Sequence, residues 1–356
     1  MELRSDAALS QALSLIAPGS PLRDGLDRIL QSGRGGLIVI GDGPQVLNIC
    51  SGGFLLDAAF SPQRLSELAK MDGAIIMASD ASRIARANVH LVPNPNVPTS
   101  ETGTRHRTAE RVARMLNDPV VAVSESRKQI QVYVGDQIRQ VLSSSRLLER
   151  SNQALQTLER YRARLSQVSR KLTALEAEDL VAVRNVVEVL QRIEMVNRIS
   201  TEIEYNLIEL GTDGRLVRLQ LEELMERVDD DRRLIITDYG RPGSEVSPER
   251  AMQALAQLSD EALFDDLRLA QTLHLIGPTG DLDENVEPRG VRLLSKLPHV
   301  SEIQVMRVVD HFGSLRKILG ATTSELEAVE GIGASRARAL KDGAARLAGD
   351  SIIDQY

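Results

Sequence analysis

The residues with the clearest capacity for chemistry lie in Glu101-Thr-Gly-Thr-Arg-His-Arg-Thr108. Apolar residues recur at helical spacing from Thr108 to Leu116, so a loop is expected to open a helix here. The start of a helix presents unpaired backbone N–H groups and the positive end of the helix dipole. Gly103 lets a ligand approach the backbone closely, and three basic side chains follow it: Arg105, His106 and Arg107. Together they predict an anion-binding site, most simply for phosphate.

Thr104 and Thr108 add hydroxyl groups that could bind the same anion or cap the helix. The alternative is an ordinary surface helix with a charged first turn. That alternative is less favoured, because cations at a helix N-terminus oppose the dipole and cost stability unless an anion binds.

Further candidates stand at the ends of expected strands. Asp72-Gly73-Ala74 opens one apolar run, and Ser124-Glu125-Ser126-Arg127 follows another. Ligands of α/β sheets gather at such strand-end loops. A carboxylate that faces a phosphate site indicates metal-assisted phosphoryl or nucleotidyl transfer, with Asp72 binding Mg²⁺ or Mn²⁺ or lying beside an attacking hydroxyl. From the residues alone, an ordinary turn at Asp72 is an equally open interpretation.

Other chemistries find no support in the sequence. It contains no Walker lysine loop, no Rossmann glycine motif after a strand and no zinc-type His/Glu spacing. The single Cys50 excludes a disulfide framework. Without a signal pattern or a membrane-length apolar run, we expect a cytoplasmic protein that makes no membrane contact, with association with the nucleoid also open.

The patterns predict a multidomain protein, part α/β and part all-α. Residues 1–147 are expected to form a mixed α/β domain in which helices pack on a central sheet. Its helices are expected over 5–31 and from Pro62. About six strands are expected, at 36–40, 45–49 (as a hairpin with the first), 71–79, 88–92, 119–123 and 129–134.

Residues 148–287 read as an elongated helical spine. Leu, Val and Ile step by three and four along two long segments, which predicts a pair of antiparallel amphipathic helices. Further helices are expected over 216–228 and roughly 248–275. This region carries 17 basic against 28 acidic residues, so it is a poor surface for nucleic acid.

Residues 288–356 contain an internal repeat. The spacing of Leu326, Val329, Ile332, Ala337 and Leu340 matches that of apolar residues 32 positions earlier. Each copy predicts two short helices joined by a tight hairpin, which resembles the helix-hairpin-helix module that grips DNA through backbone phosphates.

In the second copy of the repeat, the DNA-contacting residues are expected to be Gly331, Ile332, Gly333, Ser335 and Arg336, with Arg338 and Lys341 nearby. The first copy has His299 and Ser301 in place of the glycines, so its hairpin is expected to be structural.

Three segments carry a resemblance to a known family: Lys70-Met-Asp-Gly-Ala-Ile-Ile76, Ala87-Asn-Val-His-Leu91 and Glu101-Thr-Gly-Thr-Arg-His-Arg-Thr-Ala-Glu-Arg111. They resemble the diadenylate cyclase family. The order of cyclase domain, helical spine and terminal helix-hairpin-helix module is similar to the DNA-scanning members of that family. The resemblance implies condensation of two ATP molecules into cyclic di-AMP, with loss of two pyrophosphates, between two cyclase domains that meet face to face.

By motif position, the resemblance also assigns roles to single residues. Gly73 and Leu91 would hold the adenosine, and the segment from Gly103 to Thr108 would hold the phosphates. Asp72 would orient or activate the 3′-hydroxyl through Mg²⁺ or Mn²⁺, with Arg105 and His106 as its catalytic partners. Ser124 and Glu125 would complete the phosphate and metal shell.

The resemblance further implies assembly as an octamer, and branched DNA that lowers cyclase activity in a DNA damage checkpoint. A non-catalytic, ATP-sensing DNA-binding scaffold is the alternative function. A nuclease has little support, because the clustered carboxylates of two-metal cleavage are missing.

Overall fold

The structure is a computed structural model that describes residues 2–240, 247–276, 280–298 and 300–353. The chain divides into two compact units. The first comprises Met1–Leu155 with Glu202–Gln220, and the second comprises Gln156–Thr201 with Leu221–Tyr356. Within the described residues no helix is long and apolar enough to cross a membrane.

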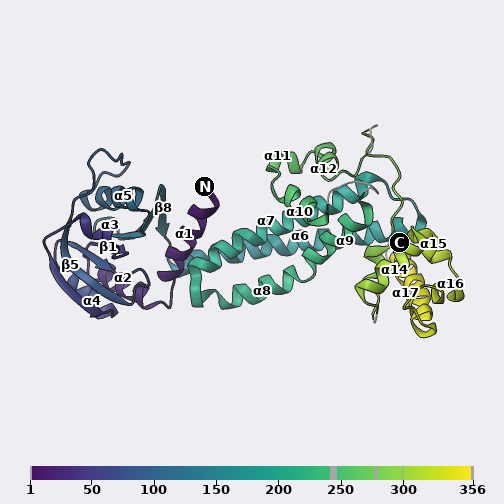
Figure 1. Ribbon diagram of the computed structural model, residues 1–356, viewed down its shortest axis with the longest axis horizontal. Helices are drawn as coiled ribbons and strands as arrows, with labels where there is room; N and C mark the ends of the chain where they lie inside the picture. Colours follow the sequence, from purple (N-terminus) through teal and green to yellow (C-terminus); the bar gives the residue numbers. More distant parts are fainter. Residues whose placement is uncertain (1, 241–246, 277–279, 299, 354–356) are drawn as a thin grey trace. The chain divides into compact units, whose positions relative to one another are not determined.

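The first unit is built on an eight-stranded mixed sheet (Figure 1). The strand order is β2-β5-β4-β1-β6-β7-β8, with β3 paired to β5. Only the β1–β4 pairing is parallel among the pairings between these strands. The strands are β1 (Gly36–Ile40), β2 (Cys50–Ser51), β3 (Phe54–Ala59), β4 (Ala74–Met77), β5 (Arg83–Leu91), β6 (Val120–Ser124), β7 (Gln129–Val134) and β8 (Gln137–Val141). The predicted mixed α/β domain with a central sheet is confirmed.

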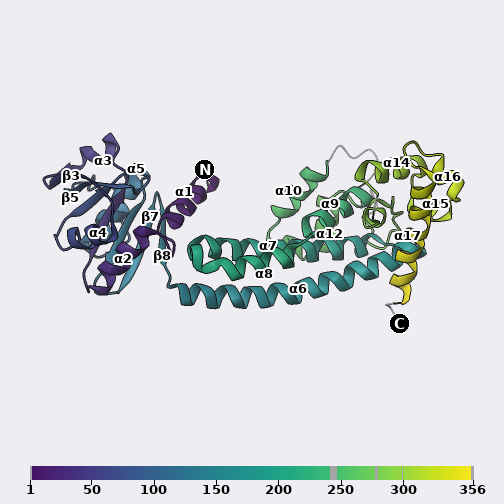
Figure 2. The ribbon, with the colours of Figure 1, turned by 90° about the horizontal axis from the view of Figure 1, so that it is seen from below.

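Helices cover both faces of this sheet and create two apolar cores (Figures 1 and 2). On one face lie α1 (Glu2–Leu15), α2 (Pro21–Gln31) and α4 (Pro62–Leu68). On the other lie α3 (Pro44–Asn48) and α5 (Thr104–Leu116). The central strands are therefore buried on both sides, which explains their continuous apolar sequence.

The sequence-based strand assignment was wrong in five places. The segment predicted as a strand at 45–49 is helix α3, which Pro44 opens at a favoured early position. Strands β2, β3 and β8 were missed, because β2 has only two residues, β3 exposes most of its side chains and β8 is half-polar. Strand β5 begins at Arg83, five residues before the predicted start.

Two long helices, α6 (Ser144–Glu178) and α7 (Val183–Leu210), give residues to both units. In the second unit, residues 156–178 and 183–201 run antiparallel side by side (Figure 2). Their facing leucines and branched residues are buried, as the periodicity predicted: Leu158, Leu165, Leu172, Val187, Leu190, Ile193 and Val196.

A series of shorter helices follows α7. Helix α8 (Arg215–Met225) is close to its predicted range, after a 3-10 turn, η1 (Gly211–Gly214). The helix predicted over 248–275 is instead three short ones, because the side chains of Ser259 and Asp265 cap new helix starts. The remaining helices are α9 (Val228–Tyr239), α10 (Pro248–Ala256), α11 (Asp260–Leu263), α12 (Asp266–Thr272), α13 (Val291–Leu294), α14 (Glu302–Phe312), α15 (Leu315–Gly320), α16 (Thr323–Glu327) and α17 (Ala334–Ile353).

A buried ionic cluster joins three helices of the second unit. The guanidinium of Arg292 in α13 pairs with Glu176 in α6, and both side chains are almost fully buried. Tyr239 in α9 donates its hydroxyl to Glu176 at 2.6 Å. Next to it, Asp238 accepts hydrogen bonds from the backbone of Gly290 and Val291 at the start of α13. Burial and the nearby Glu176 raise the pKa of Asp238 to about 6.

The terminal repeat gives two similar arrangements of a short helix, a turn and a second helix. They are α13 with α14 and α16 with α17. Their apolar residues share one core with Leu234 of α9. In the first copy Ser301 caps α14, while His299 lies outside the described residues.

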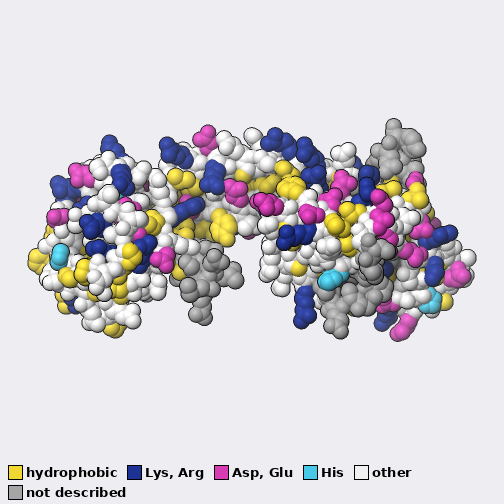
Figure 3. All heavy atoms as spheres, turned by 90° about the horizontal axis from the view of Figure 1, so that it is seen from above, with side chains coloured by type: hydrophobic (Ala, Val, Ile, Leu, Met, Phe, Trp, Pro, Cys, Tyr) yellow, Lys and Arg dark blue, Asp and Glu magenta, His cyan; other side chains and the backbone are white. Residues whose placement is uncertain are grey.

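On the face of the second unit seen in Figure 3, acidic and basic side chains are interspersed.

Candidate active site

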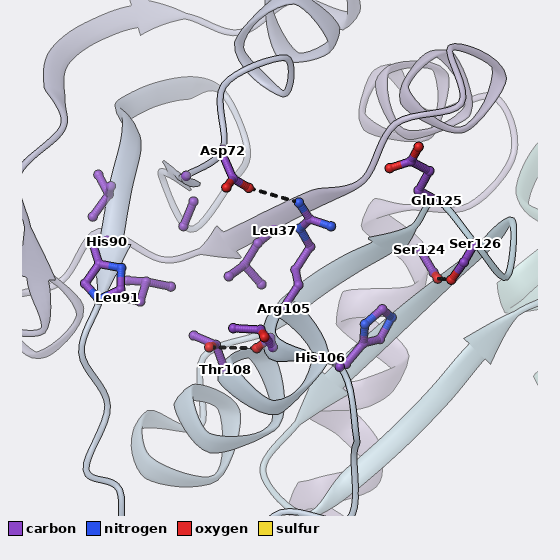
Figure 4. A pocket seen from close by; sticks show the side chains of 15 residues that line it. Leu37, Asp72, His90, Leu91, Arg105, His106, Thr108, Ser124, Glu125 and Ser126 are labelled. Atoms are coloured by element: carbon purple, nitrogen blue, oxygen red, sulfur yellow. Dashed lines mark hydrogen bonds and ion pairs between the residues drawn. The ribbon is translucent and has the colours of Figure 1, made fainter.

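A cavity of about 720 Å³ opens in the first unit where β1 and β4 begin and β5 and β6 end. This placement follows from register, since β4 runs parallel to β1 while β5 and β6 run antiparallel to them. The lining residues, most of them labelled in Figure 4, are Leu37, Asp72, Gly73, Ala74, Val89, His90, Leu91, Gly103, Thr104, Arg105, His106, Thr108, Ser124, Glu125 and Ser126.

The cavity brings together all but one of the residues predicted for nucleotide, catalysis and metal. The exception is Arg107, which is exposed and does not line it. Sequence reasoning gave no role to five lining residues: Leu37, Ala74, Val89, His90 and Ser126. Val89 and His90 stand inside a quoted motif and could have been noted. Leu37 enters only through the pairing of β1 with β4, which spacing along the chain does not reveal.

Helix α5 points its amino end into the cavity. Gly103 is the N-cap residue, makes no side-chain capping bond, and no acidic residue occupies the first turn. The dipole and the first-turn N–H groups therefore face the cavity without a compensating carboxylate from their own helix. The Thr108 hydroxyl is already engaged, because it donates to the carbonyl of Thr104 at 2.9 Å. The result is a cationic helix start suited to an anionic ligand.

Asp72 and Arg105 approach each other across the cavity (Figure 4). Nη2 of Arg105 lies 3.5 Å from Oδ1 of Asp72. The Asp72 side chain is fully exposed and that of Arg105 is one-third exposed. At this distance and exposure the pair contributes little stability. Both groups therefore remain available to a ligand.

His106 is buried beside the cavity. Burial lowers its pKa, Arg127 and Arg105 lower it further, and the charge of Glu101 opposes them. The imidazole is therefore neutral near pH 7. Its Nε2 atom is buried and has no hydrogen-bond partner within the described part of the protein. A neutral imidazole with an unsatisfied nitrogen can donate to or accept from a ligand.

The loop before α5 is fastened by Glu110, a buried residue of the same helix. It accepts the hydroxyl of Thr99 at 2.5 Å and the backbone N–H groups of Ser100 and Glu101 at 2.9 and 3.2 Å. Burial opposes the charge of Glu110, but these hydrogen bonds prevail and lower its pKa. A carboxylate of α5 therefore fixes the loop that delivers Gly103 and Thr104.

A second carboxylate, Glu101, ties the same loop to strand β7. Tyr133 donates its hydroxyl to Glu101 at 3.0 Å. Burial and Glu101 together raise the pKa of Tyr133, so the hydroxyl stays protonated and keeps donating. Arg127 approaches the other oxygen of Glu101 at 3.7 Å. Sequence reasoning gave neither Glu101 nor Tyr133 this positioning role.

Strand β6 and its turn supply the far wall. Ser124 is buried, and its hydroxyl oxygen accepts the N–H of Arg127 at 3.2 Å. Ser126 lies 3.5 Å from it, oxygen to oxygen (Figure 4). Glu125 is exposed. This wall offers hydroxyl and carboxylate oxygens opposite the cationic start of α5.

Gly73 is required by a close backbone approach. A Cβ atom at this position would lie 2.5 Å from Cα and C of Asn88, and backbone cannot withdraw as a flexible side chain can. Asn88 itself has φ of 54° at an irregularity in the β4–β5 pairing. The glycine therefore lets β5 close onto the start of β4 beside Asp72.

The carboxylates of the cavity could bind a divalent cation only if the substrate shares in the coordination. Within the described ranges, no group of three or more His, Cys, Asp or Glu side chains is placed to hold a metal ion. Two carboxylates, Asp72 and Glu125, do line the cavity. Mg²⁺ commonly keeps several waters and binds one or two carboxylates together with substrate phosphates. The residues present fit that shared mode.

Comparison with known proteins places the chain in a family. Residues 23–138 match the family described as DisA bacterial checkpoint controller nucleotide-binding, and residues 141–279 match the DisA bacterial checkpoint controller linker region. The DNA integrity scanning protein DisA of Frankia casuarinae is 50% identical over 352 residues, covering 99% of this chain and 98% of that protein. That of Streptomyces coelicolor is 47% identical over 355 residues, covering 99% and 95%. The chain therefore belongs to the DisA family, whose nucleotide-binding domain is of the diadenylate cyclase type.

Proposed function

We propose that this chain condenses two ATP molecules into cyclic di-AMP and releases two pyrophosphates. The observation that carries the proposal is the shared cavity, in which Asp72 and Gly73 at the start of β4 meet the cationic start of α5. In each of two transfers, a 3′-hydroxyl oxygen bonds to an α-phosphorus while the bond from that phosphorus to pyrophosphate breaks. A carboxylate near the hydroxyl and fixed donors around the phosphates suit such a step.

We assign the roles by motif position in the family, and each residue that receives one lines the cavity. Gly73 and Leu91 hold the adenosine, and the turn from Thr104 to His106 with Ser124 holds the phosphates. Asp72 orients the 3′-hydroxyl and takes up its proton. Arg107 does not line the cavity and receives no role in it.

Asp72 and Glu125 would hold Mg²⁺ or Mn²⁺ together with the ATP phosphates. When bound, the cation neutralises charge on the phosphates and on the departing pyrophosphate.

Two copies of the chain must cooperate in this reaction, because one cavity holds one ATP in the proposal. The full exposure of Asp72 supports this arrangement, since a second nucleotide can reach it from a facing copy. We propose that cyclase domains pair face to face within a homo-octamer.

The terminal repeat is the proposed DNA site. The hairpin between α16 and α17 is held from within by α14, because Arg307 donates to the carbonyl of Glu330 at 3.1 Å and Gln304 donates to that of Gly331 at 3.3 Å. Ile332, between the two glycines of the hairpin, is buried. The backbone of Gly331 (φ of 84°) and of Gly333 is exposed.

Exposed side chains after the hairpin would reach DNA phosphates. Ser335, Arg336 and Arg338 are all exposed at the start of α17. Lys341, which was expected to join them, donates instead to the carbonyls of Leu319 and Ala321 at 2.7 Å. We propose that branched DNA bound here lowers the cyclase activity, as part of a DNA damage checkpoint.

The test incubates the purified protein with ATP and either Mg²⁺ or Mn²⁺, with and without a four-way DNA junction. Formation of cyclic di-AMP that falls when the junction is added supports the proposal. Tight ATP binding without turnover under either metal would favour the ATP-sensing scaffold instead.

A further inference from the structure

Gly35, the residue before β1, packs against the end of the Arg105 side chain. A Cβ atom built on Gly35 would lie 2.1 Å from Nη1 and 2.8 Å from Cζ of Arg105. Contacts this short do not occur between real atoms, so the guanidinium occupies the space that any side chain at position 35 would need. The next nearest atom, the carbonyl oxygen of Val123, would be 3.1 Å away, a tight contact.

The glycine is not needed for its backbone conformation. Gly35 is absent from the glycines with positive φ, whereas Gly33, two residues earlier, has φ of 65°. An alanine at position 35 would therefore meet no backbone strain of the left-handed kind. The main obstacle is the far end of a flexible side chain, so the fold can accept alanine by moving the Arg105 guanidinium.

The opposite side of the same guanidinium faces the cavity. Nη2 of Arg105 lies 3.5 Å from Oδ1 of Asp72, and the side chain extends toward that carboxylate (Figure 4). One nitrogen thus rests against Gly35 while the other is presented to the ligand site. The position of Nη2 is set by how closely Nη1 can approach the backbone at residue 35.

We propose that Gly35 is a positioning residue for the reaction, because its missing side chain seats Arg105 where it meets the ATP phosphates. The proposal rests on the proposed function of the cavity. A donor aimed at developing charge acts through its placement, and a displacement of about 1 Å can cost up to about a hundredfold in rate.

The neighbouring glycine offers a matched control. A Cβ atom on Gly36 would lie 3.4 Å from Ile38 Cδ1 and 3.6 Å from Ile29 Cδ1, which is ordinary van der Waals contact. Gly36→Ala therefore adds the same methyl group one residue along, without touching Arg105.

The experiment compares Gly35→Ala, Gly36→Ala, Arg105→Ala and the double variant Gly35→Ala/Arg105→Ala. For each full-length protein, ATP affinity is measured by calorimetry with Mg²⁺, together with cyclic di-AMP formation. We expect Gly35→Ala to lower kcat by about tenfold to a hundredfold and to weaken ATP binding, with Gly36→Ala close to wild type in both. In the Arg105→Ala background, Gly35→Ala should change kcat and affinity by less than about threefold, because the displaced group is gone.

Two results would overturn the proposal: losses that multiply in the double variant, or a Gly35→Ala protein that behaves like Gly36→Ala. Circular dichroism and urea unfolding of each variant show whether the loss comes from misfolding, and a Gly35→Ala protein that is unfolded also counts against it. If wild-type protein makes no cyclic di-AMP, the proposed function fails, yet the pattern of ATP affinities across the four variants still decides the role of Gly35.

Discussion

Arg105 and Asp72 are 33 residues apart in the chain, yet their side chains meet at 3.5 Å in one cavity. The contact joins two motifs, one at the start of strand β4 and one at the start of helix α5. It is weak as an ion pair, because Asp72 is fully exposed. Its significance is geometric, since it places a carboxylate beside the group that is proposed to hold phosphate.

Asp72→Asn should remove the cyclase activity and leave the fold unchanged. We expect kcat to fall by about a hundredfold to ten-thousandfold, the typical range for a group that handles the reacting proton. ATP affinity should fall by much less than kcat, because the donors proposed for the phosphates remain. Stability should stay within about 0.5 kcal/mol, as for other exposed substitutions. Cyclic di-AMP formation and ATP calorimetry check both points.

Asp80→Asn is the matched control for that variant, since Asp80 is exposed and does not line the cavity. If Asp72→Asn were as active as Asp80→Asn, Asp72 would have no role in the reaction.

The protonation of His106 gives a second prediction. Its pKa in the free protein should lie below 6.5, chiefly because the imidazole is buried. This lowered pKa makes the free energy of unfolding depend on pH. His106 favours the folded state above the pKa it has in the unfolded chain, and this contribution is lost as the pH falls through its lower pKa in the folded protein. Bound ATP should raise the pKa, because phosphate charge favours imidazolium. Histidine NMR titration with and without ATP measures both, with His106→Gln to identify the resonance. A free-protein value above 6.5 would contradict the description of the site.

The cluster around Arg292 predicts a large effect on stability. Glu176→Ala leaves the buried Arg292 without its carboxylate, which should cost about 3–5 kcal/mol. Arg184→Ala breaks an exposed pair with Asp283 in the same unit and should cost less than about 1 kcal/mol. Urea unfolding followed by circular dichroism, with hydrogen exchange at α13 to locate the change, compares them. Similar losses for both variants would refute the assignment of Arg292 to a buried pair.

DNA binding is better tested by point variants than by deleting residues 288–356. Deletion would uncover Leu234 and leave Glu176 without Arg292, so the rest of the second unit would be damaged. Arg336→Ala should weaken junction binding and reduce the slope of log affinity against log salt by about 1, as expected for one lost phosphate contact. Arg268→Ala, an exposed arginine of α12, is the charge-matched control. Fluorescence anisotropy at several salt concentrations makes the measurement, and an unchanged slope in Arg336→Ala would argue against this site.

Sequence reasoning succeeded where the signal was local and failed where it was not. The helix start at Gly103 and the buried run from Ala74 follow from residue type and spacing within about ten positions. The edge strand β3 did not, because its exposed Phe54 and Leu55 show no burial alternation.

The contacts that hold the residues of the site in place depend on which strands pair in the sheet. Tyr133 reaches Glu101 only once β7 pairs with β6, and Gly35 meets Arg105 only once β1 lies beside β6. No pattern along the chain encodes these contacts, since each joins segments that the sheet brings together.

The most direct test of the central claim measures cyclic di-AMP and pyrophosphate together from purified wild-type protein, ATP and Mg²⁺ or Mn²⁺. A diadenylate cyclase releases two pyrophosphates for each cyclic di-AMP, and we predict a ratio of two to one. Neither product should form when ATP is omitted. Bound ATP with neither product, or pyrophosphate without the cyclic dinucleotide, would contradict the account.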